Sequence, residues 1–445
     1  MPTQLGDPPF TTLTASLERL EAVVSPIAGL VTATVRNTCA PDEARLVWVS
    51  GRTASCSRTT GASIPEWSGG THPSNDVARA AALGEAVERY SGAYARADAT
   101  ILATARELGP EAVAPERFAL FHHRQLESPR FPFVEFDSAT RVRFVEGFAL
   151  DDGSPAFVPS QLTYMSGWFP DEERIGLATS NGLACGATLE EAILAALYEV
   201  VERDAVMLAW KNSLSLPLLD WSDDEEIAAV DRRVFAPTGL RYSVLDGSAF
   251  FGVPVAIGVV HGPPDEQTAL GIGGGAGPTV SVAWLKALAE AFGVRRWLSL
   301  TTLENPEGPL PEAADVKSFD DHMLFYAHHE RAGLAAFLDA SERRTPTPGV
   351  TTIPGDTPRA QITELLRRLA RRGCSAYVVD VTSPDVSSIG LHVVRVLVPE
   401  LCALDVVHSA RFLGGRRLYR AAYEVGLSDR SYRFEDLNPL PHPFP

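Results

Sequence analysis

The sequence predicts a mixed fold of the α/β (α+β) class, and two observations lead to this prediction. Segments with helical periodicity alternate along much of the chain with short apolar segments typical of strands. The chain has 445 residues, of which 45% are hydrophobic, and this is enough for a large core. No interval is long enough, or biased enough in composition, to mark a clean boundary between domains.

In the first half of the chain, periodicity predicts two helices and four strands. Helices are expected at Thr11–Val24 and Asn75–Arg96, and the second helix follows a turn-rich stretch at Ser68–Ser74. Strands are expected at Leu30–Val35, Arg45–Ser57, Arg141–Ala149 and Pro155–Val158. Several prolines interrupt residues 97–170, so only short elements are expected there.

The second half begins with a strong helical pattern at Leu189–Trp210. Further helices are expected at Val282–Leu298 and Asp356–Arg372. Strands are expected at Arg241–Leu245, Val255–His261, Ser375–Val381 and Leu391–Val398. From Pro439 onward every second residue is proline, so this end can form neither a regular helix nor a central strand.

Composition excludes several classes of protein. The formal net charge is −17 and the basic residues are not clustered, which excludes nucleic acid as an expected partner. The five cysteines are scattered and form no C-x-x-C pair, which argues against a disulfide framework or a zinc site and favours a reducing cytoplasm. The N-terminus has no signal-peptide pattern and no apolar run reaches about 18 residues, so neither secretion nor a membrane span is expected.

Two segments share the pattern E-x-x-E-R, namely Glu85–Arg89 and Glu199–Arg203. Glutamates three residues apart lie on one face of a helix. An isolated pattern of this kind is usually a solvated face with an ion pair between residues four apart, and this interpretation stays open for the first copy. The second copy lies in a helix that is apolar on all sides from Ala192 to Tyr198, which indicates a helix buried on most sides.

Three glutamates of this second helix, Glu191, Glu199 and Glu202, would fall within about 80° of one another around its axis. Buried carboxylates must be paired, protonated or bound to metal, and neighbouring like charges raise one another's pKa. A hard cation such as Mg²⁺ together with a nucleotide phosphate satisfies them. Thr188 and Glu191 also match a capping box, a structural role that competes with metal binding by Glu191.

Two glycine-containing stretches bear on nucleotide binding. Ser180–Gly186 precedes the second glutamate helix as a tight loop, where backbone N–H groups can hold an anion. No Walker A sequence is present. Gly271–Pro278 could be mistaken for a dinucleotide-binding fingerprint, but Pro278 disrupts a direct turn from strand to helix, so this stretch is interpreted as a flexible loop.

Together these segments resemble the YcaO family. The strongest match runs from Ala178 to Ala205, and Ala81–Ser91 and Ala287–Arg295 are similar to the first and third acidic helices of the family. Lesser matches lie at Ser25–Leu30, Glu146–Leu150, Val158–Pro159, Leu391–Pro399 and Gly415–Tyr419. The matches extend from about residue 25 to the C-terminus, and their combination is specific although each piece alone is not.

The resemblance implies a YcaO-like fold with mixed sheets and three glutamate-bearing helices around a site for ATP and Mg²⁺. It divides the chain into an N-terminal helical extension at 1–24, a catalytic domain at 25–437 and a proline-rich tail at 438–445. The implied ligands of the metal or the phosphates are Glu85, Glu88, Glu191, Glu199, Glu202 and Glu290. The residues that would neutralise phosphate or hold the glutamates are Arg89, Arg203 and Arg295, and those that would shape the phosphate loop are Ser180 and Asn181.

Three positions depart from the family pattern. Ala187 stands where Asn is usual, Gly293 where Gln is frequent, and Thr71 where Lys often follows the double glycine. These departures leave the acidic residues intact but keep open a non-catalytic scaffold or regulator with the same fold. A nucleotide-dependent ligase is a further alternative.

The segment Pro439–Pro445 resembles the proline-rich C-terminus of azoline-forming members of the family, in which the tail enters the active site. The resemblance implies that the terminal carboxylate of Pro445 acts as a general base. Alternating prolines reduce the entropy lost on ordering, so such a segment can place a carboxylate accurately. The alternative is an ordinary disordered end.

The activity that the resemblance implies is ATP- and Mg²⁺-dependent activation of backbone amides in a ribosomally synthesised precursor peptide. Cyclodehydration of Cys, Ser or Thr would then give thiazoline or oxazoline. External sulfide or a peptide amine as the nucleophile would instead give a thioamide or a macrocyclic amidine. The expected partners are the precursor peptide and a leader-binding protein of an E1-like or ThiF-like type, and a homodimer is plausible by resemblance.

Overall fold

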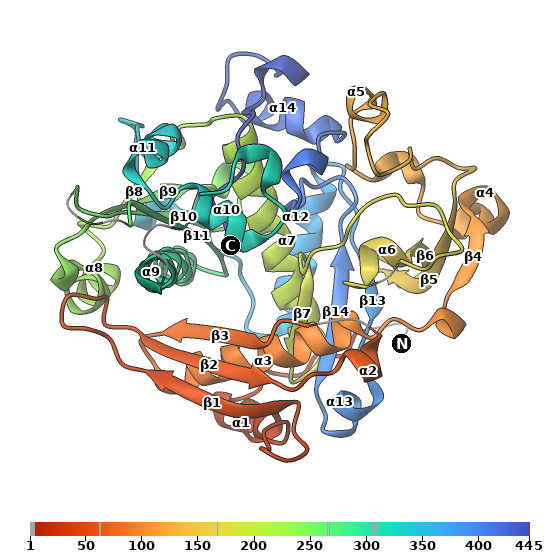
Figure 1. The fold of residues 1–445 in the computed structure, drawn as a ribbon, viewed down its shortest axis with the longest axis horizontal. Coiled ribbons are helices and arrows are strands. Elements are labelled where there is room, and N and C mark those ends of the chain that lie inside the picture. The colour runs from red at the N-terminus through yellow and green to blue at the C-terminus, as the bar shows by residue number, and fades with distance from the viewer. Residues whose placement is uncertain are drawn as a thin grey trace. The chain divides into compact units, whose positions relative to one another are not determined.

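The computed structural model describes residues 5–61, 64–166, 168–264, 266, 268–304, 308 and 310–445, and it confirms the mixed α/β fold (Figure 1). The chain forms two compact units. Unit 1 consists of Met1–Thr38, Val47–Val200 and Pro354–Leu401, and unit 2 of Cys39–Leu46, Val201–Ile353 and Cys402–Pro445. Residues 1–4 of the predicted extension at 1–24 lie outside the described residues.

The first sheet of unit 1 has three antiparallel strands in the order β1 (Val31–Asn37), β2 (Val47–Thr53) and β3 (Trp67–His72). Helix α3 (Asn75–Ala93) covers this sheet, and α1 (Leu13–Glu21) packs against α3. Gly70 makes the close approach possible, since a Cβ atom there would lie 1.9 Å from the carbonyl oxygen of Ala78 on α3.

The second sheet of unit 1 joins strands from distant parts of the chain. Its order is β4 (Ile101–Thr104), β5 (Arg141–Ala149), β13 (Tyr377–Asp380), β14 (His392–Leu397) and β7 (Leu183–Gly186), with β6 (Pro155–Pro159) paired to β5. Every pair in it is antiparallel. Several of its buried valines, among them Val158 on β6 and Val393 on β14, belong to the hydrophobic core that α3 also enters through Leu83.

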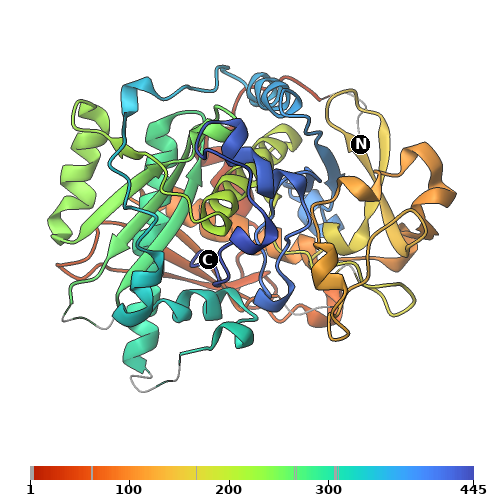
Figure 2. The ribbon, with the colours of Figure 1, turned by 90° about the horizontal axis from the view of Figure 1, so that it is seen from above.

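Unit 2 is built on a five-stranded sheet, which contains the green strands of Figure 2. Its order is β11 (Leu270–Ala276), β10 (Val255–His261), β9 (Arg241–Asp246), β8 (Leu218–Asp220) and β12 (Arg344–Pro346). Helix α9 (Val280–Glu304) packs across β10 and β11. Helix α7 (Leu189–Lys211) begins in unit 1 and continues into unit 2.

Strand β11 corrects the interpretation of Gly271–Pro278 as a flexible loop, since most of this stretch is a buried strand. Gly271, Gly273 and Gly275 lie on the side of the strand that faces α9. A Cβ atom would come within 2.3 Å of α9 backbone at Gly271, 2.5 Å at Gly273 and 2.3 Å at Gly275. The glycines therefore serve close packing between a strand and a helix, and Pro278 lies between the end of the strand and the start of α9.

The remaining helices are short. In unit 1 they are α2 (Ser57–Thr60), α4 (Ala105–Leu108), α5 (His123–Leu126), α6 (Ser160–Thr163), α12 (Pro358–Ala370) and α13 (Pro384–Ser388). In unit 2 they are α8 (Glu225–Val234), α10 (Phe319–Phe325), α11 (His329–Ala332) and α14 (Arg416–Glu424). No helix among the described residues has the length and apolar composition needed to cross a membrane.

The proline-rich tail at 438–445 has no regular secondary structure but is packed into unit 2. The side chain of Phe444 is completely buried. Trp210 on α7 donates a hydrogen bond to the Leu440 carbonyl (3.2 Å), and Tyr326 after α10 donates one to the Pro441 carbonyl (2.6 Å). The tail is therefore an ordered part of unit 2, and the alternative of a disordered end is wrong.

Candidate active site

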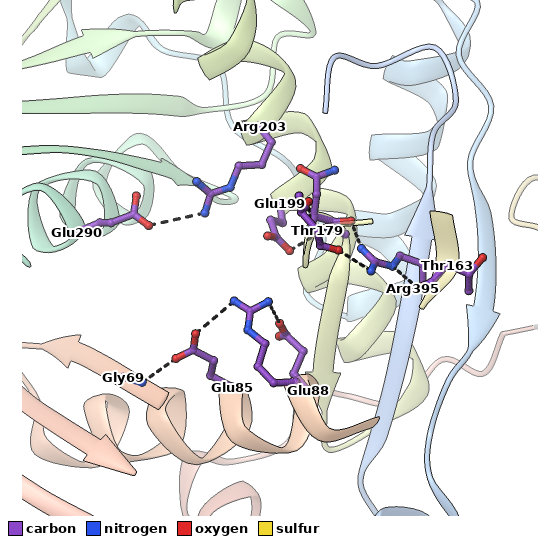
Figure 3. A network of polar contacts seen from close by, with 12 residues as sticks. Gly69, Glu85, Glu88, Thr163, Thr179, Glu199, Arg203, Glu290 and Arg395 are labelled. Carbon is purple, nitrogen blue, oxygen red and sulfur yellow. Dashed lines mark hydrogen bonds and ion pairs between the residues drawn. The ribbon is translucent and has the colours of Figure 1, made fainter. Parts of the chain in front are cut away.

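Helix α3 presents two glutamates and an arginine on one face of unit 1 (Figure 3). Arg89 lies 3.2 Å from Glu85 and 3.4 Å from Glu88, measured between guanidinium nitrogen and carboxylate oxygen. The second oxygen of Glu85 accepts a hydrogen bond from the backbone N–H of Gly69 on β3 (2.6 Å). The first E-x-x-E-R pattern is thus not a solvated face, since the side chain of Glu88 is only 18% exposed.

Glu88 lies in an environment that disfavours its negative charge. Burial raises its pKa well above the usual range, and the carboxylates of Glu199 and Glu85 raise it further. The guanidinium groups of Arg89 and Arg395 oppose this effect but do not cancel it. Burial by itself would lower the pKa of Arg89, yet the surrounding carboxylates raise it overall, so Arg89 stays charged. Burial and the neighbouring carboxylates thus disfavour the ionised form of Glu88, and a nearby positive charge would favour it.

Arg395, on β14, is the residue of this region that sequence reasoning missed. It is 1% exposed and donates hydrogen bonds to the backbone carbonyl oxygens of Thr163 (2.7 Å), Thr179 (2.7 Å) and Asn181. Burial lowers its pKa to about 10, while the charges of Glu199 and Glu88 act in the opposite direction. The signal in the sequence was a single charged residue within the apolar strand pattern Leu391–Val398, because a buried charge needs a specific reason to be there.

The loop that Arg395 holds contains the predicted phosphate-loop residues. The backbone N–H of Gly182 donates to Glu199 on α7 (3.2 Å), and that of Asn181 to the hydroxyl of Thr179 (3.2 Å). Gly182 has φ +78°, a left-handed conformation that favours glycine. Asn181 Oδ1 is buried without a hydrogen-bond partner, and Ser180 contributes its carbonyl oxygen to the N–H of Leu183 (2.7 Å). A buried acceptor of this kind indicates a group that the described residues do not supply.

Unit 2 has its own carboxylate group. Arg203 on α7 lies 3.5 Å from Glu202 and 3.6 Å from Glu290 on α9. The backbone N–H of Gly274 on β11 donates to Glu290, and Glu202 is 7% exposed. A Cβ atom on Gly274 would come 3.0 Å from a carboxylate oxygen of Glu202, so the glycine leaves space beside this buried carboxylate.

Two predicted site residues have other partners in the structure. Glu191 accepts a hydrogen bond from the backbone N–H of Thr11 (2.5 Å), while its own N–H is capped by the hydroxyl of Thr188 (3.1 Å). It precedes Glu199 by eight residues, about 12 Å along the helix axis, a distance that an angular projection of the helix ignores. Arg295 on α9 forms an ion pair with Glu266. The structure therefore brings neither residue into the carboxylate groups described above.

The donor set fits a magnesium ion that is bound together with phosphate. Among the described residues, no three or more His, Cys, Asp or Glu side chains are grouped so that they could hold a metal by themselves. Mg²⁺ usually keeps several waters and takes one or two carboxylates together with the phosphates of its nucleotide. Glu88, whose ionised form is disfavoured by burial and by the charge of Glu199, and the unpaired oxygen of Asn181 meet this requirement.

A family model described as YcaO cyclodehydratase, ATP- and Mg²⁺-binding, matches residues 69–402. Comparison with curated protein sequences gave no match. Among solved structures, a heterocyclase in complex with substrate and cofactor is 26% identical with a TM-score of 0.82, over 99% of this chain and 59% of that chain. The heterocyclase TruD is 25% identical with a TM-score of 0.71, over 100% of this chain and 56% of that one.

A third structure extends the likeness of the fold. The structure of YcaO from Methanopyrus kandleri bound with AMPPCP and Mg²⁺ is 21% identical with a TM-score of 0.60, over 87% of this chain and 90% of that chain. This chain spans less than two thirds of the length of either heterocyclase, 59% of one and 56% of the other.

Proposed function

Because this chain belongs to the YcaO family, we propose that it uses ATP and Mg²⁺ to cyclodehydrate Cys, Ser or Thr residues of a ribosomally synthesised precursor peptide. The products would be thiazoline or oxazoline rings. The observation that carries the proposal is the carboxylate group around Glu88, where burial and the charges of Glu199 and Glu85 disfavour the ionised form of Glu88. Such a group is stabilised by a bound Mg²⁺ ion.

The bound nucleotide would supply the phosphoryl group that converts the amide oxygen of the peptide into a leaving group, since hydroxide leaves poorly. The chain would position the nucleotide phosphates and neutralise their charge, which accounts for most of the catalysis in phosphoryl transfer. In unit 1 the proposed ligands are Glu85, Glu88 and Glu199, with Arg89 as their charge partner. In unit 2 they are Glu202 and Glu290, with Arg203 as their charge partner.

The remaining predicted residues have distinct proposed roles. Asn181 would offer its unpaired oxygen, and Ser180 would shape the same loop. Glu191 and Arg295 would have to exchange their present partners before they could take part. The terminal carboxylate of Pro445 is the proposed general base, and the burial of Phe444 next to it supports a fixed position for the chain end.

Calorimetric titration with Mg²⁺ and AMPPCP tests the nucleotide site. Glu88→Gln and Glu202→Gln each replace a carboxylate by a neutral group of the same shape, and we expect both to weaken binding at least tenfold. Glu225→Gln is the matched control, because Glu225 is 86% exposed and forms an ion pair on the surface of α8. Binding that is unchanged in both site variants would refute the proposed site.

The chemistry is tested with peptides rich in Cys, Ser and Thr, with and without candidate partner proteins. Loss of one water per modified residue, detected by mass spectrometry and dependent on ATP, would support cyclodehydration. Incorporation of sulfur from added sulfide would identify a thioamide-forming enzyme instead. If the protein binds no nucleotide, alone or with partners, the scaffold reading motivated by Ala187, Gly293 and Thr71 replaces this proposal.

We also propose that a leader-binding partner protein presents the precursor peptide. The likeness to a heterocyclase solved in complex with substrate and cofactor supports the binding of a substrate by this fold. If the purified protein alone modified a precursor at full rate, this part of the proposal would fail. Sedimentation of the purified protein would show whether it forms the proposed homodimer.

A further inference from the structure

Arg395 is a buried cation whose hydrogen bonds all go to neutral groups. Its three bonds use three different guanidinium nitrogens and end on three backbone carbonyl oxygens, and it forms no ion pair with any described residue (Figure 3). Desolvating a charge is unfavourable, and the nearby charges of Glu199 and Glu88 oppose this cost without accepting a hydrogen bond from Arg395, so core packing alone is an insufficient explanation. The arrangement indicates a function for the loop that Arg395 holds.

One peptide group of this loop is held at both ends by opposite charges. The carbonyl oxygen of Asn181 accepts from Arg395, and the N–H of the same peptide group, which belongs to Gly182, donates to Glu199. A trans peptide is planar and its C=O and N–H point in opposite directions. The cation and the carboxylate therefore fix the orientation of this group about both of its flanking bonds.

The neighbouring groups complete the restraint. The carbonyl of Thr179 also accepts from Arg395, and the carbonyl of Gly182 accepts from the N–H of Val396 on β14 (2.7 Å). A side chain on Gly182 is excluded because a Cβ atom would lie 2.3 Å from the Val396 carbonyl oxygen. The loop thus has little freedom, although the Asn181 amide oxygen within it has no partner.

We infer that Arg395 is a positioning residue, which holds the Thr179–Gly182 loop so that Asn181 and Glu199 are correctly placed for the phosphates and metal of the nucleotide. The inference rests on the proposed function for the identity of that ligand. The positioning role needs the three separate nitrogens of the guanidinium group, each of which donates to a different carbonyl oxygen. A lysine keeps the charge but has a single nitrogen.

Arg395→Lys is therefore the decisive variant. We expect its affinity for Mg²⁺–AMPPCP to fall by 10- to 100-fold, roughly the effect of removing a group that orients a metal ligand. The matched control is Arg52→Lys, since Arg52 is an exposed arginine paired with Glu66, and its affinity should not change. An affinity of Arg395→Lys equal to that of the wild type would overturn the inference.

A double-mutant cycle separates positioning from a general structural role. If Arg395 acts through Asn181, the double variant Arg395→Lys/Asn181→Ala should lose less binding free energy than the two single variants lose in sum. Both substitutions would then disrupt the same contact with the nucleotide. Fully additive losses would contradict the inference. A variant that weakened binding only through lost stability would show no such coupling.

Hydrogen exchange tests the loop without any ligand, so it separates failure of this inference from failure of the proposed function. In Arg395→Lys the amides of Gly182 and Leu183 should exchange faster, while those of β5 remain unchanged. Unchanged loop exchange would refute the role of Arg395 even if the nucleotide proposal stands. If the variant does not fold, hydrogen exchange of the ligand-free wild type still tests the inference. The Gly182 amide should then be protected, and free exchange there would refute the role of Arg395.

Discussion

Replacing Glu88 by Gln should make the ligand-free protein more stable at neutral pH, although it removes a proposed metal ligand. Burial and the neighbouring carboxylates raise the pKa of Glu88 well above its usual range, so its ionised form is disfavoured in the folded state. In the unfolded chain the carboxyl ionises near its ordinary pKa of about 4.3. Between the two pKa values the folded state holds a proton that the unfolded state has lost.

The sign of the pH dependence follows from this difference in bound protons. The free energy of unfolding changes with pH in proportion to the number of protons bound by the unfolded state minus the number bound by the folded state. For Glu88 this difference is negative between the pKa of the unfolded state and that of the folded state. The contribution is constant below a pH of about 4 and falls as pH rises, by up to about 1.4 kcal/mol per pH unit, until the raised pKa of the folded state is passed. Glu88→Gln lacks this decline.

Urea unfolding of both proteins between pH 5 and 8 measures the difference, and subtracting the two curves removes the other titrating groups. The gap in the free energy of unfolding should widen with pH in favour of Glu88→Gln. Mg²⁺–AMPPCP should oppose it, because a ligand at 100 times the wild-type Kd stabilises the wild type by about 2.7 kcal/mol but a variant that binds tenfold more weakly by only about 1.4 kcal/mol. Parallel curves for the two ligand-free proteins would refute the reasoning, and Glu225→Gln should run parallel to the wild type.

Four further substitutions test packing, one in unit 1 and three in unit 2. Gly273→Ala places a Cβ atom 2.5 Å from α9 backbone and should lower the free energy of unfolding by about 1–3 kcal/mol. Gly84→Ala, whose Cβ atom would meet nothing within 4 Å, should raise the free energy of unfolding by roughly 0.5–1 kcal/mol. Thermal unfolding of the two variants and the wild type measures both effects. Tyr326→Phe leaves a buried tail carbonyl without its donor, at about 1–3 kcal/mol, and should speed removal of the tail by carboxypeptidase without changing the rest of the fold. Lys211→Met leaves the buried Asp405 without the amine 2.5 Å away and should cost about 3–5 kcal/mol, measured as a lower midpoint in urea; an unchanged midpoint would contradict the assignment of this ion pair.

The sequence was most informative where spacing within one helix decides the geometry. Glu85 with Glu88, and Glu199 with Glu202, are three residues apart, so the helix alone fixes each pair on one face. The expected strands occur within a few residues of their predicted bounds, because the apolar runs and turn residues that mark them are local in the sequence. Glu290 lies outside any E-x-x-E-R pattern, so only the resemblance to the YcaO family identified it and its helix as part of the site.

Interactions between distant segments could not be predicted in this way. Arg395 contacts a loop more than 200 residues earlier in the chain, and no spacing rule connects the two. A projection down the helix axis places Glu191 beside Glu199 only because it discards the distance between them along that axis. The glycines of β11 were assigned to a loop since only the tertiary structure shows the helix that lies against them.

The strand order of the large sheet in unit 1 has a consequence for how the protein is made. β5 and β7 leave the ribosome early, but β13 and β14, which stand between them, follow only after residue 376. Until then both early strands present open edges, which invite pairing with other chains. Such long-range pairing is slow, since the intervening loop must close first. Nascent chains should therefore depend on a chaperone that shields these edges until the last two strands of the sheet have been synthesised.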